Sequence, residues 1–305
     1  MFPEYPPQPM TWELHSAKRL PGGRGVDGGS VWRWNRTAVM GIVNVTPDSF
    51  SDGGRFADAT SAVEHAGEMV AAGAAIVDVG GESTRPGADP VDPEVELSRV
   101  LPVISALREE SLPALISVDT RHAVVAEAAT AAGAHLVNDV SGLDDPDMAG
   151  VCSRAGVPVV VVHHRGIPVA LGDEPEYGDV VAEVTAWLSD RIAMARAAGI
   201  PSVIADPGIG FGKGQRHNLA ILAALPLDVD GPVLIGASRK RFVGAITGAA
   251  AAADRDVGSA IVHVEAARRA AAIVRVHDVV TQIQALRMAA ALDAAFAAAG
   301  GRPSS

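Results

Sequence analysis

The strongest constraint on the fold is an alternation between short apolar runs and Ala-rich helical patterns, which persists along most of the chain. Eight runs of apolar, mostly β-branched residues occur at residues 39–44, 75–79, 115–119, 135–138, 158–163, 202–206, 233–236 and 273–277. Near-continuous apolarity within a run is typical of strands that are covered on both faces. The segments between the runs, such as residues 60–72 and 121–132, have helical character, and several are followed by glycine, which commonly ends helices.

Strand–helix alternation with short connections predicts a parallel sheet with right-handed crossovers. Eight such units fit a closed (β/α)8 barrel, the TIM barrel, better than an open sheet. Their uneven spacing does not fit a solenoid. We therefore predict an α/β protein with a single barrel domain over residues 38–297 and a short C-terminal tail at residues 298–305.

Residues 1–37 differ from the rest of the chain because they are rich in proline and glycine. No basic start followed by an apolar block occurs there, so the segment does not resemble a secretory signal. We expect a flexible N-terminal arm or an edge hairpin, since chain termini are often poorly ordered. The single cysteine, Cys152, has no partner for an internal disulfide, and we expect a cytoplasmic protein.

Charge and hydropathy restrict the partners of the chain. The formal net charge is −11, whereas a nucleic-acid partner requires a basic surface. No apolar run approaches the length of about 18 residues that indicates a membrane-spanning helix. We therefore expect small-molecule substrates, with no nucleic-acid or membrane partner.

Polar side chains at the ends of the apolar runs indicate where a site could form. They are Asn44, Asp119, Asn138, His163, Asp206, Arg275 and His277, with Ser238 and Lys240 after the seventh run. In a TIM barrel the carboxyl ends of all strands face one rim, where active sites are built. Any single residue of this set could be an ordinary cap or turn residue, but so many at one rim predict a shared site.

Two kinds of chemistry are indicated at this rim. Asp119, Asn138, Asp206 and Lys240 combine hydrogen-bond acceptors with amide and ammonium donors. Such a set suits a flat, nitrogen-rich heterocycle whose edge displays both donors and acceptors.

A second group of rim residues predicts an anion pocket. Arg275 and His277 are two positions apart, so they point to the same side of the last strand. Asn44 and Ser238 join them at the rim. Phosphate sites after the seventh and eighth strands are frequent in this fold.

Three loops carry further expectations. Residues 46–54 and 81–87 combine glycine, proline, charge and hydroxyl groups, which suits mobile lids, although ordinary turns have a similar composition. Residues 208–214 match neither the phosphate-loop nor the dinucleotide-binding spacing, and we expect this loop to bring backbone and Phe211 close to a ligand. The adjacent His163 and His164 point to opposite faces of a strand, which argues against a metal site there.

Seven motifs occur in order along the predicted strand ends. They are Asn44–Gly54, Gly81–Gly87, Ser117–Thr120, Val137–Val140, Asp206–Lys213, Gly236–Lys240 and Arg275–Asp278. With these motifs the sequence resembles the dihydropteroate synthases, a family of pterin-binding barrels, over roughly residues 38–295. One motif alone would be moderate evidence, whereas seven in the correct order are very specific.

The resemblance implies a transferase of folate biosynthesis with Mg²⁺ as cofactor. The expected reaction condenses (7,8-dihydropterin-6-yl)methyl diphosphate with 4-aminobenzoate, giving 7,8-dihydropteroate and diphosphate by dissociative displacement. The resemblance places the pterin pocket at Asp119, Asn138, Asp206 and Lys240. It also implies a homodimer formed through the outer helices near the end of the barrel, in a region that includes residues 261–288.

The resemblance also assigns the other two pockets. The diphosphate pocket falls at Arg275 and His277, beside Ser238, with Asn44 as the Mg²⁺ ligand. The 4-aminobenzoate pocket is shaped by Phe50, Thr84, Arg85, Pro86 and Phe211, and Asp48 and Asp52 help to close it. The residues expected to act in catalysis are Asp48, Asp52, Arg85, Asp206 and Lys240.

Two departures from the family pattern and two alternative functions accompany this hypothesis. Val162 and His164 flank His163 where many relatives carry methionine, and Arg241 follows Lys240 where some have serine. A pterin-dependent methyltransferase would share the Asp and Asn pterin pocket but would not need the Arg275/His277 anion site. A non-catalytic pterin-binding paralogue is the second alternative.

Overall fold

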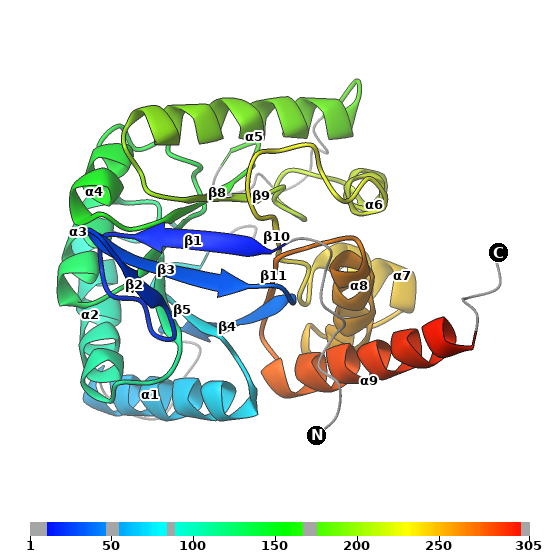
Figure 1. Ribbon diagram of the computed structural model, residues 1–305, viewed down its shortest axis with the longest axis horizontal. Helices are drawn as coiled ribbons and strands as arrows, with labels where there is room; N and C mark the ends of the chain where they lie inside the picture. Colours follow the sequence, from blue (N-terminus) through cyan, green and yellow to red (C-terminus); the bar gives the residue numbers. More distant parts are fainter. Residues whose placement is uncertain (1–10, 47–54, 84–88, 167–175, 300–305) are drawn as a thin grey trace.

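The computed structural model describes residues 11–46, 55–83, 89–166 and 176–299. Eight parallel strands form one sheet in the order β10-β11-β4-β5-β6-β7-β8-β9. A parallel bridge between Ala205 and Val233 brings β9 against β10, so the sheet curls into a nearly closed barrel. Helices surround the strands (Figure 1), and the predicted TIM barrel is confirmed.

The strands of the barrel are short and follow the apolar runs of the sequence. They are β4 (Ala38–Asn44), β5 (Ile76–Gly80), β6 (Leu115–Asp119), β7 (Leu136–Asp139), β8 (Val159–Val162), β9 (Val203–Asp206), β10 (Leu234–Ile235) and β11 (Ile273–Val276). The helices are α1 (Arg55–Ala72), α2 (Pro93–Glu109), α3 (Ala123–Ala132), α4 (Met148–Ala155), α5 (Val180–Ala197), α6 (Gln215–Ala223), α7 (Arg241–Thr247), α8 (Asp256–Arg268) and α9 (Val279–Ala298). A short 3-10 helix, Ala253–Arg255, precedes α8.

Local sequence signals set several of the helix boundaries. Asp92 caps α2 by accepting from the Glu94 backbone N–H at 2.8 Å, with Pro93 in the first turn, where its missing N–H costs nothing. Asp179 and Asp278 cap α5 and α9 in the same way. Gly156 ends α4 in the left-handed conformation, with φ of 64°, which other residues adopt less readily.

The inner face of the barrel changes from apolar to polar along the strands. One buried layer inside the barrel consists of Met40, Ile76, Leu115, Leu136, Val160, Ile204, Leu234 and Ile273. Because side chains alternate between the two faces of a strand, the residues two positions further along also face inward. Those residues include Asp78, Asn138, Asp206 and Arg275. The polar residues therefore gather toward the carboxyl ends of the strands.

The opposite end of the barrel is covered by the N-terminal segment. Strands β1 (Trp12–Ser16), β2 (Arg24–Val26) and β3 (Gly29–Trp34) form an antiparallel sheet in the order β1-β3-β2, which lies across the strands in Figure 1. Trp12, Leu14 and Leu20 are buried in the inner apolar layer.

Hydrogen bonds also fasten this sheet to the barrel. The Trp34 indole N–H donates to the Ala272 carbonyl at 3.1 Å, and the Ala17 N–H donates to the Gly156 carbonyl at 2.7 Å. Of the two alternatives expected for this segment, the structure therefore shows a small antiparallel sheet rather than a flexible arm over Trp12–Trp34, because the apolar side chains of β1 close the base of the barrel. Residues 1–10 lie outside the described residues.

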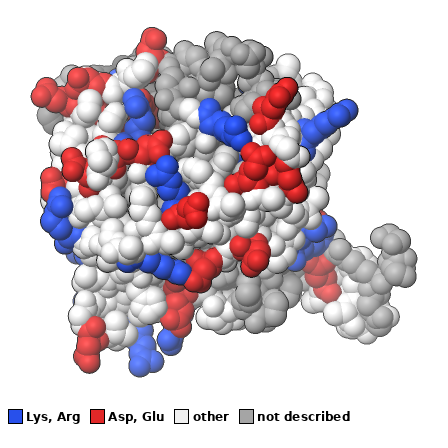
Figure 2. All heavy atoms as spheres, turned by 90° about the horizontal axis from the view of Figure 1, so that it is seen from above, with Lys and Arg blue, Asp and Glu red and all other residues white. Residues whose placement is uncertain are grey.

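The surface agrees with the charge of the sequence. On the face seen in Figure 2, acidic and basic side chains are interspersed, with no broad basic area among the described residues. None of the helices in the described part of the chain combines the length and the hydropathy needed to cross a membrane.

The burial of β1 generates a stability prediction. Leu14 is fully buried against the base of the barrel, whereas Val26 on β2 is 44% exposed. We expect Leu14→Ala to lower the free energy of unfolding by about 2–5 kcal/mol, as for other buried leucines. The Val26→Ala control should change it by less than about 0.5 kcal/mol. Urea denaturation measures both values, and equal effects would contradict the packing described here.

Candidate functional site

A buried ion-pair network crosses the mouth of the barrel. Arg275 of β11 donates from Nε to Asp78 Oδ2 of β5 at 2.6 Å, and from Nη2 to Asp119 Oδ2 of β6 at 2.5 Å. The Asn138 amide of β7 also donates to Asp78 Oδ2, at 2.9 Å. Asp78 has no solvent exposure, and a buried carboxylate is tolerated only when it is paired and hydrogen-bonded. The network therefore stabilises a charged cluster that could not exist as isolated residues.

Several polar atoms in this cluster retain acceptor capacity. Asp78 Oδ1, Asn138 Oδ1 and the Ser117 hydroxyl are buried without a hydrogen-bond partner. A buried acceptor without a donor costs free energy, on the order of 1–3 kcal/mol. A ligand that presents N–H groups to these residues at the mouth of the barrel could supply the missing hydrogen bonds.

Asp206 and Lys240 extend the site on the other side of the barrel. Asp206 ends β9, and its Oδ1 accepts from the Gly208 N–H at 2.7 Å. Lys240 precedes α7, and its Nζ lies 4.2 Å from the centre of the Phe211 ring, within the range of a cation–π contact.

Burial shifts the proton affinities of these groups in opposite directions. It raises the pKa of Asp206 to about 6 and that of Asp119 to about 7, against the favourable effect of nearby cations. Burial also lowers the pKa of Lys240 to about 8, against the effect of Asp206 and Asp119. Lys240 is thus close enough to interact with both carboxylates. Perturbed groups that converge in this way are typical of functional sites.

Ser238 and His277 form a separate pair at the same rim. The Ser238 hydroxyl oxygen accepts from the His277 backbone N–H at 3.1 Å and lies 3.0 Å from His277 Nδ1. If Nδ1 carries no hydrogen, the hydroxyl donates to it and Nε2 is the N–H donor of the neutral imidazole. In a charged ring, Nδ1 would instead donate to the hydroxyl oxygen, and Nε2 would be the second donor.

Among the residues that the structure describes, Asn44 is a candidate ligand for Mg²⁺. It ends β4 opposite Gly80 and is partly buried. Its amide oxygen is a hard ligand of the kind that Mg²⁺ accepts, and this ion usually completes its shell with water and substrate phosphate oxygens. The residue therefore fits a metal that arrives with a phosphorylated substrate.

Glu82, Glu96 and His122 form another group of possible metal ligands, which sequence reasoning did not single out. Arg121 already pairs with both oxygens of Glu82, at 2.8 and 3.0 Å, and His122 Nδ1 lies 2.7 Å from Glu96 Oε2. The Arg121 guanidinium and the His122 imidazole thus already pair with the carboxylates that a metal would need as ligands. This cluster braces the ends of β5 and β6 against α2.

The described residues place most of the expected site at one rim. These are Asn44, Asp119, Asn138, Asp206, Phe211, Ser238, Lys240, Arg275 and His277, which all lie at or just beyond the carboxyl ends of the strands. The expected residues Asp48, Phe50, Asp52, Thr84, Arg85 and Pro86 lie outside the described residues. Sequence reasoning missed Asp78, although an acidic residue two positions after Ile76 in a buried strand was a usable signal.

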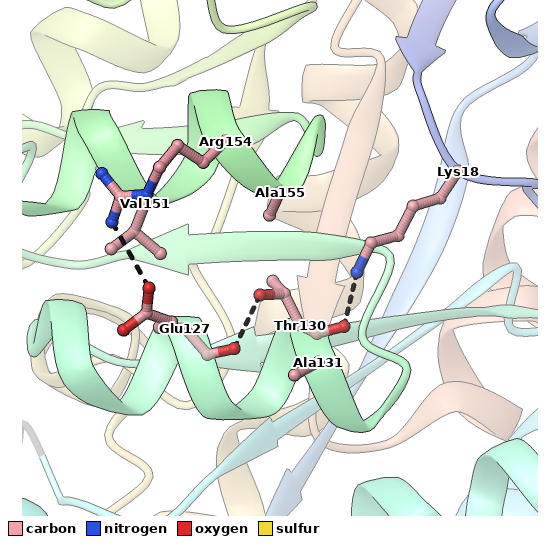
Figure 3. Close-up of a pocket in the computed structure, with 7 residues that line it drawn as sticks. All are labelled: Lys18, Glu127, Thr130, Ala131, Val151, Arg154 and Ala155. Atoms are coloured by element: carbon pink, nitrogen blue, oxygen red, sulfur yellow. Dashed lines mark hydrogen bonds and ion pairs between the residues drawn. The ribbon is translucent and has the colours of Figure 1, made fainter.

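A cavity of about 260 Å³ lies away from this rim, between α3 and α4 (Figure 3). Its polar side chains are paired among themselves or with the backbone: Arg154 Nη2 lies 3.3 Å from Glu127 Oε1, and Lys18 Nζ donates to the Thr130 carbonyl. Lys18 comes from the N-terminal segment that closes the other end of the barrel. The charged groups around this cavity therefore already have hydrogen-bond or ion-pair partners.

The two departures from the family pattern do not disturb the network. His164 Nε2 lies 2.9 Å from the Ser141 carbonyl and its ring stacks edge-on against Trp187 of α5. Val162 is the residue that faces the barrel interior. Arg241 is the first residue of α7.

Comparison with known proteins agrees with this geometry. The sequence profile of the family described as "Pterin binding enzyme" matches residues 40–277. The dihydropteroate synthase of Mycobacterium leprae (strain TN) is 48% identical over 264 residues, covering 83% of this chain and 92% of the relative. The Xanthomonas albilineans dihydropteroate synthase solved with 4-aminobenzoic acid is 44% identical, with a TM-score of 0.78 over 90% of this chain and 96% of that one.

A second structure from the same organism, in complex with 7,8-dihydropteroate, is 41% identical, with a TM-score of 0.75 over 90% of this chain and 97% of that one. These matches extend over nearly the whole barrel and over the strand ends that carry the network. The chain therefore belongs to the dihydropteroate synthases of the pterin-binding enzyme family.

Proposed function

We propose that this protein condenses (7,8-dihydropterin-6-yl)methyl diphosphate with 4-aminobenzoate to form 7,8-dihydropteroate and diphosphate, a step of folate biosynthesis. The observation that carries the proposal is the buried network of Asp78, Asp119, Asn138 and Arg275, with its unpartnered acceptors at the mouth of the barrel. The 4-aminobenzoate and dihydropteroate bound by the similar Xanthomonas structures support it. A cytoplasmic location, expected from the sequence, stays a prediction.

The pterin ring is proposed to bind among Asp119, Asn138, Asp206 and Lys240. Carboxylate and amide oxygens accept from the ring N–H and amino groups, and the Lys240 ammonium and the Asn138 amide donate to the ring acceptors. Discrimination should be strong, because a ligand that lacks these groups would leave buried polar atoms unpaired.

The reaction proceeds by loss of diphosphate before the new bond is complete. The C–O bond breaks with its electron pair leaving on the diphosphate, and positive charge develops on the pterin methylene, where Asp206 and Asp119 stabilise it electrostatically. The lone pair of the 4-aminobenzoate amine then forms the C–N bond, and the amine releases a proton. The arylamine is a weak nucleophile, so its orientation contributes more than a strong base would.

The leaving group is proposed to be held by cationic and polar residues of the rim. Arg275 keeps N–H groups beyond the two that bind Asp78 and Asp119, and His277 with Ser238 lies beside it. Asn44 would hold Mg²⁺ together with diphosphate oxygens. When bound, the metal neutralises charge on the departing diphosphate.

The 4-aminobenzoate pocket is proposed to involve Phe211 and the loop residues Phe50, Thr84, Arg85 and Pro86, with Asp48 and Asp52 contributing to closure. Among these residues, Phe211 lies in the part of the chain that the structure describes. It packs against the inner apolar layer of the barrel beside Lys240. A flat aromatic substrate suits a site with an aromatic wall and an adjacent cation.

The function is tested by mixing the protein with Mg²⁺, the pterin diphosphate and 4-aminobenzoate. We expect diphosphate and dihydropteroate to appear in equal amounts. Diphosphate release without formation of dihydropteroate when 4-aminobenzoate is present would contradict the condensation. Pterin binding without diphosphate release would favour the non-catalytic paralogue, and methyl transfer from a methylated pterin would favour the methyltransferase.

The shifted proton affinities predict a bell-shaped pH profile of kcat/KM. Asp206 and Asp119 must be ionised, so activity should fall as the pH drops through about 6 to 7. Lys240 must be protonated, so activity should fall as the pH rises through about 8. Lys240→Arg keeps a charge at high pH and should move the alkaline limb upward without moving the acid limb. An unmoved alkaline limb would rule out Lys240 as its origin.

We also propose a homodimer formed through α8 and α9, which pack side by side. Val257 and Ile261 on α8 and Met288 and Leu292 on α9 are 45–68% exposed, and the spacing of four residues places each pair on one helix face. Light scattering should give twice the chain mass of 31.2 kDa. Ile261→Glu with Met288→Glu should give monomers, whereas Val26→Glu should not. A monomeric wild type would end this proposal.

A further inference from the structure

The buried lysine Lys213 is a residue of the β9–α6 loop for which the proposed reaction has no role. Its side chain is only 8% exposed. Its Nζ lies 2.8 Å from His163 Nδ1, 3.0 Å from the Gly208 carbonyl, 3.1 Å from the Phe211 carbonyl and 3.3 Å from the His163 carbonyl. One ammonium group thus joins the end of β8 to two points of the loop that follows β9.

Three of the four neighbours are carbonyl oxygens, so Lys213 must be the donor to them. An ammonium group offers three hydrogens, one more than a neutral amine. Burial and the charge of Lys213 lower the pKa of His163 to about 3, so its ring is neutral, and toward a charged Lys213 its Nδ1 is the acceptor. Burial lowers the pKa of Lys213 to about 7, against the effect of Asp206, so the ammonium form holds the loop below about pH 7, and the three carbonyl acceptors favour that form.

The loop held by Lys213 is tightly packed against β8. A Cβ at Gly208 would lie 1.8 Å from the His163 carbonyl oxygen, and Gly208 has a φ of +65°. Asn218 accepts from the Gly210 N–H at 2.8 Å and donates to the Lys213 carbonyl at 3.2 Å. The backbone of this loop therefore has little freedom as long as its central cation is present.

Phe211 is the side chain that this arrangement presents to the site. Its N–H donates to the Gly208 carbonyl at 3.0 Å, and its carbonyl accepts from Lys213. Both backbone groups are thus anchored to the same cluster, and the ring lies under Lys240 Nζ. A displacement of the loop would move the ring away from Lys240.

We propose that Lys213 is a positioning residue that fixes Phe211 and, through the Phe211 ring, Lys240 at the mouth of the barrel. Its role in turnover rests on the proposed function, whereas its effect on the position of Lys240 does not. Lys213 exerts this effect through its hydrogen bonds to the carbonyl groups of Gly208 and Phe211 and its contact with His163.

NMR signals of the lysine side chains test this proposal, because the chain has only three lysines, Lys18, Lys213 and Lys240. Labelling lysine with ¹³C at Cε gives three methylene signals. Each signal is assigned by the single lysine substitution that removes it. We expect the Lys240 signal to be shifted upfield by the Phe211 ring and to lose that shift in Phe211→Leu. Lys213→Met should move the Lys240 signal downfield as well, because the Phe211 ring would then no longer lie against Lys240. An unchanged Lys240 signal in Lys213→Met would overturn the proposal.

Lys18→Met is the matched control. Lys18 is also partly buried and donates to a backbone carbonyl, that of Thr130, but it lies at the other end of the barrel. This variant should leave the Lys240 signal and the activity as in the wild type. Unfolding curves of both variants show whether any change follows from lost stability; a Lys240 shift caused equally by Lys18→Met would count against a specific role for Lys213.

A kinetic cycle tests the same link in turnover. Lys213→Met should lower kcat/KM by about 10²-fold, the scale expected when reacting groups are displaced by about 1 Å. In a Phe211→Leu background the same substitution should add little, because both changes remove one contact. Independent, multiplying losses would contradict positioning through Phe211. A wild type without turnover would refute the proposed function, while the lysine signals would still decide the role of Lys213.

Discussion

The arrangement of the barrel mouth depends on the pairing of Arg275 with Asp78 and Asp119. These residues come from β11, β5 and β6, and β4 lies between β11 and β5 in the sheet. The guanidinium therefore spans the interior of the barrel rather than joining neighbouring strands. Although burial disfavours its charge, Asp78 and Asp119 raise the pKa of Arg275. Removing either carboxylate would leave a buried charge incompletely paired, which is expensive in a site of low polarity.

The two ends of the barrel differ in polarity because of the geometry of the strands. Inward residues recur every second position, and those near the amino ends of the strands are apolar and packed under Trp12 and Leu14. Near the carboxyl ends, several inward residues are charged or carry an amide: Asp78, Asp119, Asn138, Asp206 and Arg275. The N-terminal sheet excludes water from one end, so the polar groups at the other end form the accessible face of the interior. Chemistry and stability are thus separated along the barrel axis.

The fold, and the position of many candidate-site residues at one rim, were predictable from the sequence. Asp119, Asn138, Asp206 and Arg275 could be found because each ends or nearly ends an apolar run, and a parallel barrel brings those ends together. Asp78 was missed because it stands inside such a run, where a carboxylate has no meaning until its partner Arg275, 197 positions away, is known.

The other surprises have the same origin. Trp12 and Leu14 stand in a segment whose proline and glycine suggested a loose arm, and only packing against distant strands orders it. Lys213 stood in a glycine-rich loop that matched no phosphate motif, and its four acceptors come from two segments that the sequence separates. Pairings between distant residues were therefore the part that local patterns could not supply.

The residues around Arg275 are proposed to form the pterin-binding and reaction site. A crystal structure of the protein with the pterin diphosphate tests this proposal most directly. The ring N–H and amino groups should lie within hydrogen-bonding distance of Asp119, Asn138 and Asp206, with the diphosphate near His277 and Ser238. A ligand bound away from the carboxyl ends of β6, β7 and β9 would contradict the account.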